Sequence, residues 1–203
     1  DKEAPLCAPA GMELRVDPRA RHASSDSAMC VWPPHLEAGS EALAATIDAL
    51  NDKAGMVDAA GAIARERSAA AASGRPGPAV ISMSHMLPRQ ELLPEKRHLF
   101  MPTLHEIVGS TFLRRRVDAL RPDVHVFGHT HFGWDATLDG IRYFQAALAY
   151  PEERGHRLQS LKAGGQFPTA TPSTPLLVFD SGRGFPPRYN AAWSPARFEL
   201  AIS

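Results

Sequence analysis

The chain lacks an excess of charge of either sign, and it lacks a long hydrophobic run. Its 203 residues include 22 basic and 22 acidic side chains, so the formal net charge at pH 7 is zero. A neutral chain has no global field that attracts it to nucleic acid or to an anionic membrane, and we expect specific binding to neither. No apolar stretch approaches the roughly 20 residues that span a bilayer. Recognition of any ligand therefore has to come from a local site.

Cysteine is almost absent, since Cys7 and Cys30 are the only two. Two thiols so placed match neither a zinc ribbon nor a dense disulfide framework, and they favour a reducing compartment. The amino-terminal residues lack the charged and then apolar layout of a signal peptide. We therefore expect a soluble, cytoplasmic protein.

Three common catalytic motifs are also missing. The sequence contains no G-x-S-x-G, which argues against a serine nucleophile on a strand-to-helix turn. It contains neither G-x-G-x-x-G nor G-x-x-x-x-G-K, the glycine-rich loops that hold phosphate groups of nucleotides. Serine hydrolases, dinucleotide-binding enzymes and P-loop proteins are therefore disfavoured.

The elements that are present alternate between helix and strand. Ser40 is a good N-cap before an apolar pattern of helical period, and Asp139-Gly140 is a strong signal for a hairpin turn. Residues 1–30 show no sustained period. We expect one domain over residues 1–203, irregular at 1–30. Helices are expected at 40–52, 55–72 and 103–122, the last with a capping box at Thr103 and Glu106. A buried strand is expected at 79–85, a surface loop at 86–102, a strand at 123–127, then the hairpin, and a further strand at 175–182.

This order of elements predicts a layered α/β or α+β fold. In such folds, ligands bind beyond the carboxyl ends of the strands. His85 follows one predicted strand, and His129 and His131 follow another, so all three are expected at this edge.

Imidazole is a common ligand of divalent transition metals. The glycine before the His129 and His131 pair allows either a positive φ or close approach of the backbone to a ligand. In an extended segment, side chains two positions apart point the same way, roughly 6.6 Å apart. The pair is thus suited to one ion, or to two ions about 3.5–4 Å apart as in binuclear hydrolases.

Other polar residues have simpler explanations. His125 alternates with valines inside a strand, which indicates a hydrogen-bonded interior residue rather than a ligand. The run from Arg114 to Arg116 falls late in the helix expected at 103–122, where cations complement the helix dipole and face solvent. Asp135 follows the histidine pair closely, and we consider it a candidate for orienting a ligand histidine.

The stretch "VFGHTH", preceded by "RPDVH" and by "ISMSH" upstream, resembles the carboxyl-terminal half of calcineurin-like metallophosphoesterases. The resemblance covers roughly residues 79 to 150, and 31 to 52 fit the preceding segment of some members. It implies part of a four-layer fold, a β sandwich flanked by helices. It further implies a phosphoester substrate and two divalent ions (Mn, Fe, Zn or Mg) with a bridging hydroxide that attacks phosphorus. By position, His85 and His129 would bind one ion and His131 the other.

The carboxylate motifs of that family are not found. The family has an Asp-x-His, a Gly-Asp and a Gly-Asn-His nearer the amino terminus, and the last of these supplies the catalytic histidine. The sole Asp-x-His here, beginning at Asp123, enters its strand instead of leaving it, and residues 1–78 hold no Gly-Asp and no Gly-Asn-His. Three imidazoles offset none of the four charges of two divalent ions, so carboxylates are needed. We therefore assign no catalytic residue within the chain.

Several hypotheses follow from this mismatch. In the first hypothesis, which we favour, the chain is a fragment or shortened gene product of an enzyme. In the second, another polypeptide completes it. In the third, it is a degenerate homologue that acts as a scaffold or interaction protein. A mononuclear zinc site with three histidines is a further alternative. A missing half would also leave an exposed sheet edge through which the chain could self-associate.

Overall fold

The structure is a computed structural model, and it describes residues 31–37, 40–53, 56–94, 99, 104–148, 150, 161–162, 176–187 and 190–191. The segment 1–30, expected to be irregular, lies outside these ranges. The described elements are helices α2 (Glu41–Lys53), α3 (Met56–Ala72) and α4 (Thr111–Leu120), 3-10 helices η2 (Gln90–Leu92) and η4 (Leu104–Glu106), and strands β1 (Ile81–Met83), β2 (Val124–Val126), β3 (Trp134–Leu138), β4 (Ile141–Gln145), β5 (Leu161–Lys162) and β6 (Asn190–Ala191).

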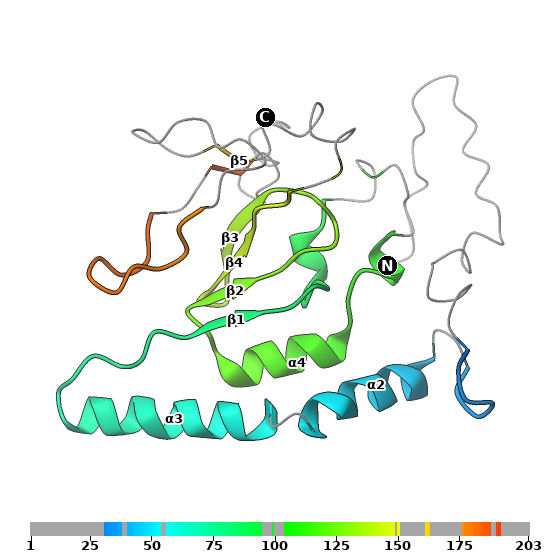
Figure 1. The fold of residues 1–203 in the computed structure, drawn as a ribbon, viewed down its shortest axis with the longest axis horizontal. Coiled ribbons are helices and arrows are strands. Elements are labelled where there is room, and N and C mark those ends of the chain that lie inside the picture. Colours follow the sequence, from blue (N-terminus) through cyan, green and yellow to red (C-terminus); the bar gives the residue numbers. More distant parts are fainter. Residues whose placement is uncertain are drawn as a thin grey trace.

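Four strands form a mixed sheet in the order β1-β2-β4-β3. β1, β2 and β4 are parallel, and β3 pairs antiparallel with β4. Figure 1 shows α4 between this sheet and the two helices α2 and α3, which lie nearly end to end. The mixed α/β class is therefore confirmed. The four-layer sandwich and the loss of an amino-terminal half remain predictions.

One face of the sheet packs against α4 and against the chain between β1 and α4. The strand register places Ala136, Tyr143 and His125 in one row across this face. Val117 is the buried residue of α4, and it joins the core. The core consists of Leu87, Leu92, Leu93, Leu99, Val108, Val117, Phe127, Phe132, Trp134, Ala136, Ile141 and Tyr143.

The hairpin between β3 and β4 is present at the predicted residues. Asp139 has φ 50° and Gly140 has φ 81°. Two successive positive φ angles are those of a type I′ turn, whose twist matches that of the flanking strands. The turn prediction is confirmed.

The helix predicted over 103–122 begins later than its capping box suggested. A short 3-10 helix ends at Glu106, and α4 begins at Thr111 with Ser110 as N-cap, whose Oγ accepts from the Leu113 amide at 3.2 Å. Between these two helices, Gly109 forms an isolated β-bridge with Leu87, in the loop that follows β1. The two backbones are so close that a Cβ on Gly109 would lie 1.9 Å from the Leu87 carbonyl oxygen. This contact interrupts the helix.

The prediction that β1 is buried is wrong. Ile81 is 40% exposed and Met83 is 78% exposed. β1 is an outer strand of the sheet, and none of the described residues covers the face to which these two side chains belong. Within the described residues, β1 is one of the two outer strands of this sheet and β3 is the other. Self-association through an exposed sheet edge remains a prediction.

Two irregular segments also differ from their predictions. The described part of the loop expected on the surface at 86–102 contributes Leu87, Leu92 and Leu93 to the core. The strand expected at 175–182 is absent: described residues from 176 onward have no regular structure until an isolated bridge joins Asp180 to Gly184. The prolines in 86–102 predicted a surface loop and the apolar run in 175–182 predicted a strand, but tertiary contacts set the environment of both segments.

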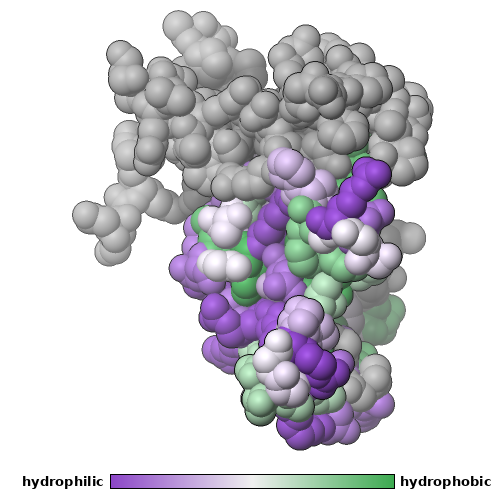
Figure 2. Space-filling model, turned by 90° about the vertical axis from the view of Figure 1, so that its left-hand side faces the viewer, coloured by the Kyte–Doolittle hydropathy of each residue, from purple (hydrophilic) through white to green (hydrophobic). Residues whose placement is uncertain are grey.

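The described surface is mixed in character. Figure 2 shows hydrophilic side chains interspersed with small hydrophobic patches on one face. Among the described residues, no helix combines the length and the hydropathy required to cross a membrane.

Candidate metal centre

His85 and His129 meet at the carboxyl ends of two adjacent parallel strands. The Gly128 amide donates to the His85 carbonyl at 3.1 Å, which joins the loops that leave β1 and β2. His85 Nε2 lies 3.1 Å from His129 Nδ1, and the two rings meet edge to face with centroids 5.0 Å apart. The sequence prediction that residues from two strand ends converge therefore holds for these two rings.

The segment after β2 is not extended, contrary to expectation. His129 has φ 70°, and the Thr130 amide donates to the Gly128 carbonyl at 2.8 Å, which closes a three-residue turn around His129. A γ-turn with positive φ is rare and strained. His131 also has a positive φ, 58°. The positive φ angles thus fall on the two histidines, while Gly128 has none.

Contacts from β4 hold this strained loop in place. Gln145 is buried, and its Nε2 donates to Thr130 Oγ1 at 3.1 Å and to the Phe132 carbonyl. Non-glycine residues in left-handed conformations cost of order 1–3 kcal/mol and persist where surrounding contacts fix them, often at functional sites. The strain at His129 is an independent reason to regard this loop as a site.

His131 has a different neighbour. Its ring meets that of Tyr150 edge to face, with centroids 5.0 Å apart. Across the described residues, no three side chains of His, Cys, Asp or Glu gather closely enough to hold an ion. The structure therefore brings together two of the three predicted ligands and places the third in a separate contact.

The spacing of the histidine pair fits a shared metal ion. Two nitrogens that each lie about 2.1 Å from one ion are about 3.0 to 3.4 Å apart for angles between 90° and tetrahedral. The observed 3.1 Å between His85 Nε2 and His129 Nδ1 is the length of a hydrogen bond between the two rings in the metal-free chain, and it falls in this range. The pair supplies two nitrogen ligands, and further ligands are required to complete a coordination shell.

His125 is an interior residue with both ring nitrogens hydrogen bonded, as predicted. Ser84 Oγ donates its single proton to the Met86 carbonyl at 2.7 Å, so it must accept from His125 Nε2, 2.9 Å away. The proton of the neutral ring is therefore on Nε2, and Nδ1 accepts from Ser82 Oγ at 2.8 Å. Burial lowers the pKa of His125 to about 4, which keeps the ring neutral.

Asp135, the candidate for orienting a ligand histidine, is fully buried on β3 and pairs with Arg142 of β4. Both carboxylate oxygens accept from the guanidinium, at 2.9 and 2.7 Å. Arg142 also donates to the carbonyls of Pro186 and Pro187. Arg142 thus links the sheet to the segment 176–187, and the role of Asp135 in orienting a ligand histidine stays a prediction.

The arginine run has three distinct environments. Arg116 donates to Asp48 and Asp52 of α2 and is only 19% exposed, so its solvent-facing prediction is wrong. This pairing lowers the pKa of Asp48. Arg114 pairs with Asp118, and Arg115 lies over the Phe112 ring. Because α4 begins at Thr111, the run lies in its middle and does not complement its carboxyl-terminal dipole.

Comparison with known proteins adds no family to this description: no family model, curated protein or solved structure matches the chain. The fold and site define a mixed α/β chain with a histidine pair at the carboxyl edge of its sheet. The sequence reasoning missed Ser82 and Ser84 as partners of His125. Their alternation before His85, in register with a histidine on a neighbouring strand, is the signal that would have found them. Tyr150 carried no such signal.

Proposed function

We propose that the chain contributes the imidazole ligands of a metal-dependent phosphoester hydrolase of the calcineurin-like kind. In this proposal His85 and His129 bind one divalent ion and His131 binds a second. The observation that carries the proposal is the 3.1 Å approach of His85 Nε2 to His129 Nδ1, from loops that follow adjacent parallel strands.

Three features support this role. The His85 side chain is exposed, so an ion can reach it. The loop after β2 holds His129 and His131 in strained conformations that Gln145 helps to fix. The hydrogen bond from Gly128 to the His85 carbonyl sets the distance between the two loops before any ion binds. A site fixed in advance reduces the reorganisation needed for binding.

The protein groups have separate tasks in this proposal. His85 presents Nε2 and His129 presents Nδ1, each as an unprotonated nitrogen, so the remaining ring nitrogens carry the protons. A divalent ion, when bound, supplies positive charge for phosphate oxygens and for activation of water. The chain offers no carboxylate to offset this charge among the described histidine neighbours. Hydrolysis therefore requires carboxylates from other parts of the polypeptide or from a partner.

The same absence favours a second candidate, a degenerate homologue that serves as a scaffold or interaction protein. The mononuclear site with three histidines is less well supported, because His131 lies against Tyr150 instead of joining the pair. Metal content distinguishes the candidates. Two ions per chain in the presence of the carboxylates favour the hydrolase, one ion favours the mononuclear site, and none favours the scaffold.

Calorimetric titration of the metal-free chain with Zn²⁺ and Mn²⁺ tests the metal site directly. We expect His85→Asn and His129→Asn each to weaken binding at the shared site by at least about tenfold, the effect of losing one good ligand interaction. His35→Asn is a matched control, because His35 is exposed on the segment before α2. Equal binding by the wild type and the paired-site variants would remove the metal assignment.

The hydrolase assignment has its own test. The transcript sequence upstream of the Asp1 codon should encode an Asp-x-His, a Gly-Asp and a Gly-Asn-His. The corresponding longer protein should hydrolyse p-nitrophenyl phosphate with Mn²⁺, and His129→Asn should abolish that activity while His35→Asn leaves it unchanged. A stop codon upstream, together with no metal binding by the chain, would support the scaffold candidate over the enzyme.

A further inference from the structure

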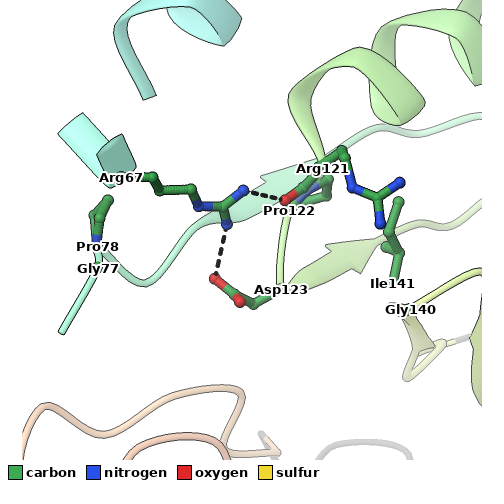
Figure 3. A pocket seen from close by; sticks show the side chains of 8 residues that line it. All are labelled: Arg67, Gly77, Pro78, Arg121, Pro122, Asp123, Gly140 and Ile141. Carbon is green, nitrogen blue, oxygen red and sulfur yellow. Dashed lines mark hydrogen bonds and ion pairs between the residues drawn. The ribbon is translucent and has the colours of Figure 1, made fainter. Parts of the chain in front are cut away.

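A hollow of about 500 Å³ lies at the opposite end of the parallel strands from the histidine pair. Its walls come from α3, from the turn before β1, from the connection between α4 and β2, and from the hairpin tip (Figure 3). About 500 Å³ is within the size range of small-molecule sites. The lining residues are Arg67, Gly77, Pro78, Arg121, Pro122, Asp123, Gly140 and Ile141.

Asp123 is the one carboxylate in this lining, and its charge is already compensated. Its Oδ2 accepts from the Val80 amide at 2.7 Å and from Arg67 Nη2 at 3.4 Å. Arg67 Nη1 also donates to the Arg121 carbonyl at 2.7 Å. Arg67 and Asp123 thus form a neutral pair, which leaves the charge of Arg121 as the net charge of the hollow.

Arg121 has two features that a purely structural capping residue does not need. It ends α4 in the left-handed conformation, with φ 47° and ψ 58°, where glycine is the usual residue. Its guanidinium makes no hydrogen bond or ion pair with any residue of the described part of the chain. Arg121 is exposed, so an anion can reach its guanidinium, and left-handed non-glycine residues often lie at functional sites.

The surroundings leave space next to this guanidinium. Figure 3 shows the Arg121 side chain extended over Ile141, on the other side of its own carbonyl from Arg67. Gly140 has no side chain, and a Cβ there would lie 3.8 Å from Arg121 Nη2. The planar guanidinium can therefore present two parallel N–H groups to an anion, the geometry that suits phosphate and carboxylate oxygens.

We propose that this arginine pocket, defined by the eight lining residues, binds a small molecule through its phosphate or carboxylate group. Arg121 contacts the anionic group, and Arg67 neutralises Asp123 so that the anion is not repelled. Pro78 precedes His85 by seven residues, which in an extended strand corresponds to roughly 23 Å. The pocket is therefore separate from the histidine pair, and the proposal does not depend on metal binding.

Nuclear magnetic resonance of the ¹⁵N-labelled chain tests the proposal. The titrants are sodium phosphate and sodium acetate at pH 7, with sodium chloride at matched ionic strength, and EDTA is present so that no metal ion recruits phosphate elsewhere. The amides of Gly77 and Gly140 report on the pocket. We expect saturable shifts of both amides with phosphate or acetate, and none with chloride.

Three variants make the result specific. Arg121→Gln removes the charge, and Arg121→Gly removes it while relieving the left-handed strain, so the latter keeps the fold. We expect each to raise the dissociation constant by roughly 10- to 100-fold, the worth of a charge-assisted hydrogen bond. Arg75→Gln removes a nearby exposed charge outside the pocket and should leave the dissociation constant unchanged.

The outcomes separate cleanly. Saturation by phosphate alone identifies phosphorylated ligands, and saturation by acetate identifies carboxylates. Shifts that never saturate, that persist in both Arg121 variants, or that centre on Gly128 at the histidine edge would overturn the proposal. Equal weakening by Arg75→Gln would also overturn it, because the effect would then be general electrostatics.

Discussion

We expect the protein to lose stability when the pH is lowered from 7 to 5, because His125 is buried as a neutral ring in the middle of the sheet. His125 is 1% exposed, it lies between Ser82 and Ser84, and burial lowers its pKa to about 4. In the unfolded chain the same ring has a pKa of about 6.5. Between these two values the unfolded state binds a proton that the folded state does not, so stability is complete above pH 6.5 and falls as the pH decreases.

The size of this loss follows from the two pKa values. The full difference corresponds to about 3 kcal/mol of unfolding free energy, reached near pH 4, and about 2 kcal/mol of it is lost between pH 7 and pH 5. Asp48 and Glu91 also have lowered pKa values, but their contributions are lost only as the pH falls below about 4.5. These two carboxylates therefore contribute little to the change in stability between pH 7 and pH 5.

Urea denaturation at several pH values, followed by tryptophan fluorescence, measures the effect. Trp134 is buried in the core and reports on global unfolding. His125→Gln keeps a donor and an acceptor but cannot titrate, so its unfolding free energy should change little between pH 7 and 5. His35→Gln should behave like the wild type. Parallel pH curves for the wild type and His125→Gln would show that titration of His125 does not cause the loss of stability.

Three further predictions concern packing and can be checked by the same denaturation measurement. Gly109→Ala should lower the free energy of unfolding by more than about 3 kcal/mol, because the added Cβ would lie 1.9 Å from a backbone oxygen. Gly128→Ala should lower it by less than about 1 kcal/mol, because the nearest atoms to its Cβ would be 3.5 Å away. Similar costs for the two would contradict the close approach. Arg142→Met should cost roughly 3–5 kcal/mol because it removes the guanidinium from which both oxygens of the buried Asp135 carboxylate accept. A loss below about 1 kcal/mol would contradict a buried ion pair. Arg116→Met should cost about 1 kcal/mol and speed amide exchange in α2, since this partly exposed side chain links α4 to α2; unchanged exchange would count against that link.

Local signals in the sequence predicted the elements that depend on local chemistry. Ser40 caps α2 through its Oγ, which accepts from the Leu43 amide, and Asp139-Gly140 forms the hairpin turn. These two predictions are confirmed because a capping hydrogen bond and a tight turn each depend on residues within four positions of one another. The capping box at Glu106 failed because the close contact between Gly109 and the chain after β1 outweighs helix propensity.

The candidate site was predictable in part for the same reason. The order of strands places His85 and His129 at one edge, since carboxyl ends of parallel strands lie together. The conformation of the loop was not predictable, because its left-handed residues depend on Gln145 in a strand that follows in the sequence. Burial of β1 was also misjudged: an apolar run does not reveal whether its strand lies in the centre or at the edge of a sheet.

The shared metal site is tested most directly by ¹⁵N resonance of the histidine side chains during titration of the metal-free chain with Zn²⁺. We expect Nε2 of His85 and Nδ1 of His129 to shift together, with one common binding curve, and the two nitrogens of His125 to remain unchanged. Ligation of only one of the paired rings, or of neither at saturating Zn²⁺, would contradict the claim that these histidines share an ion.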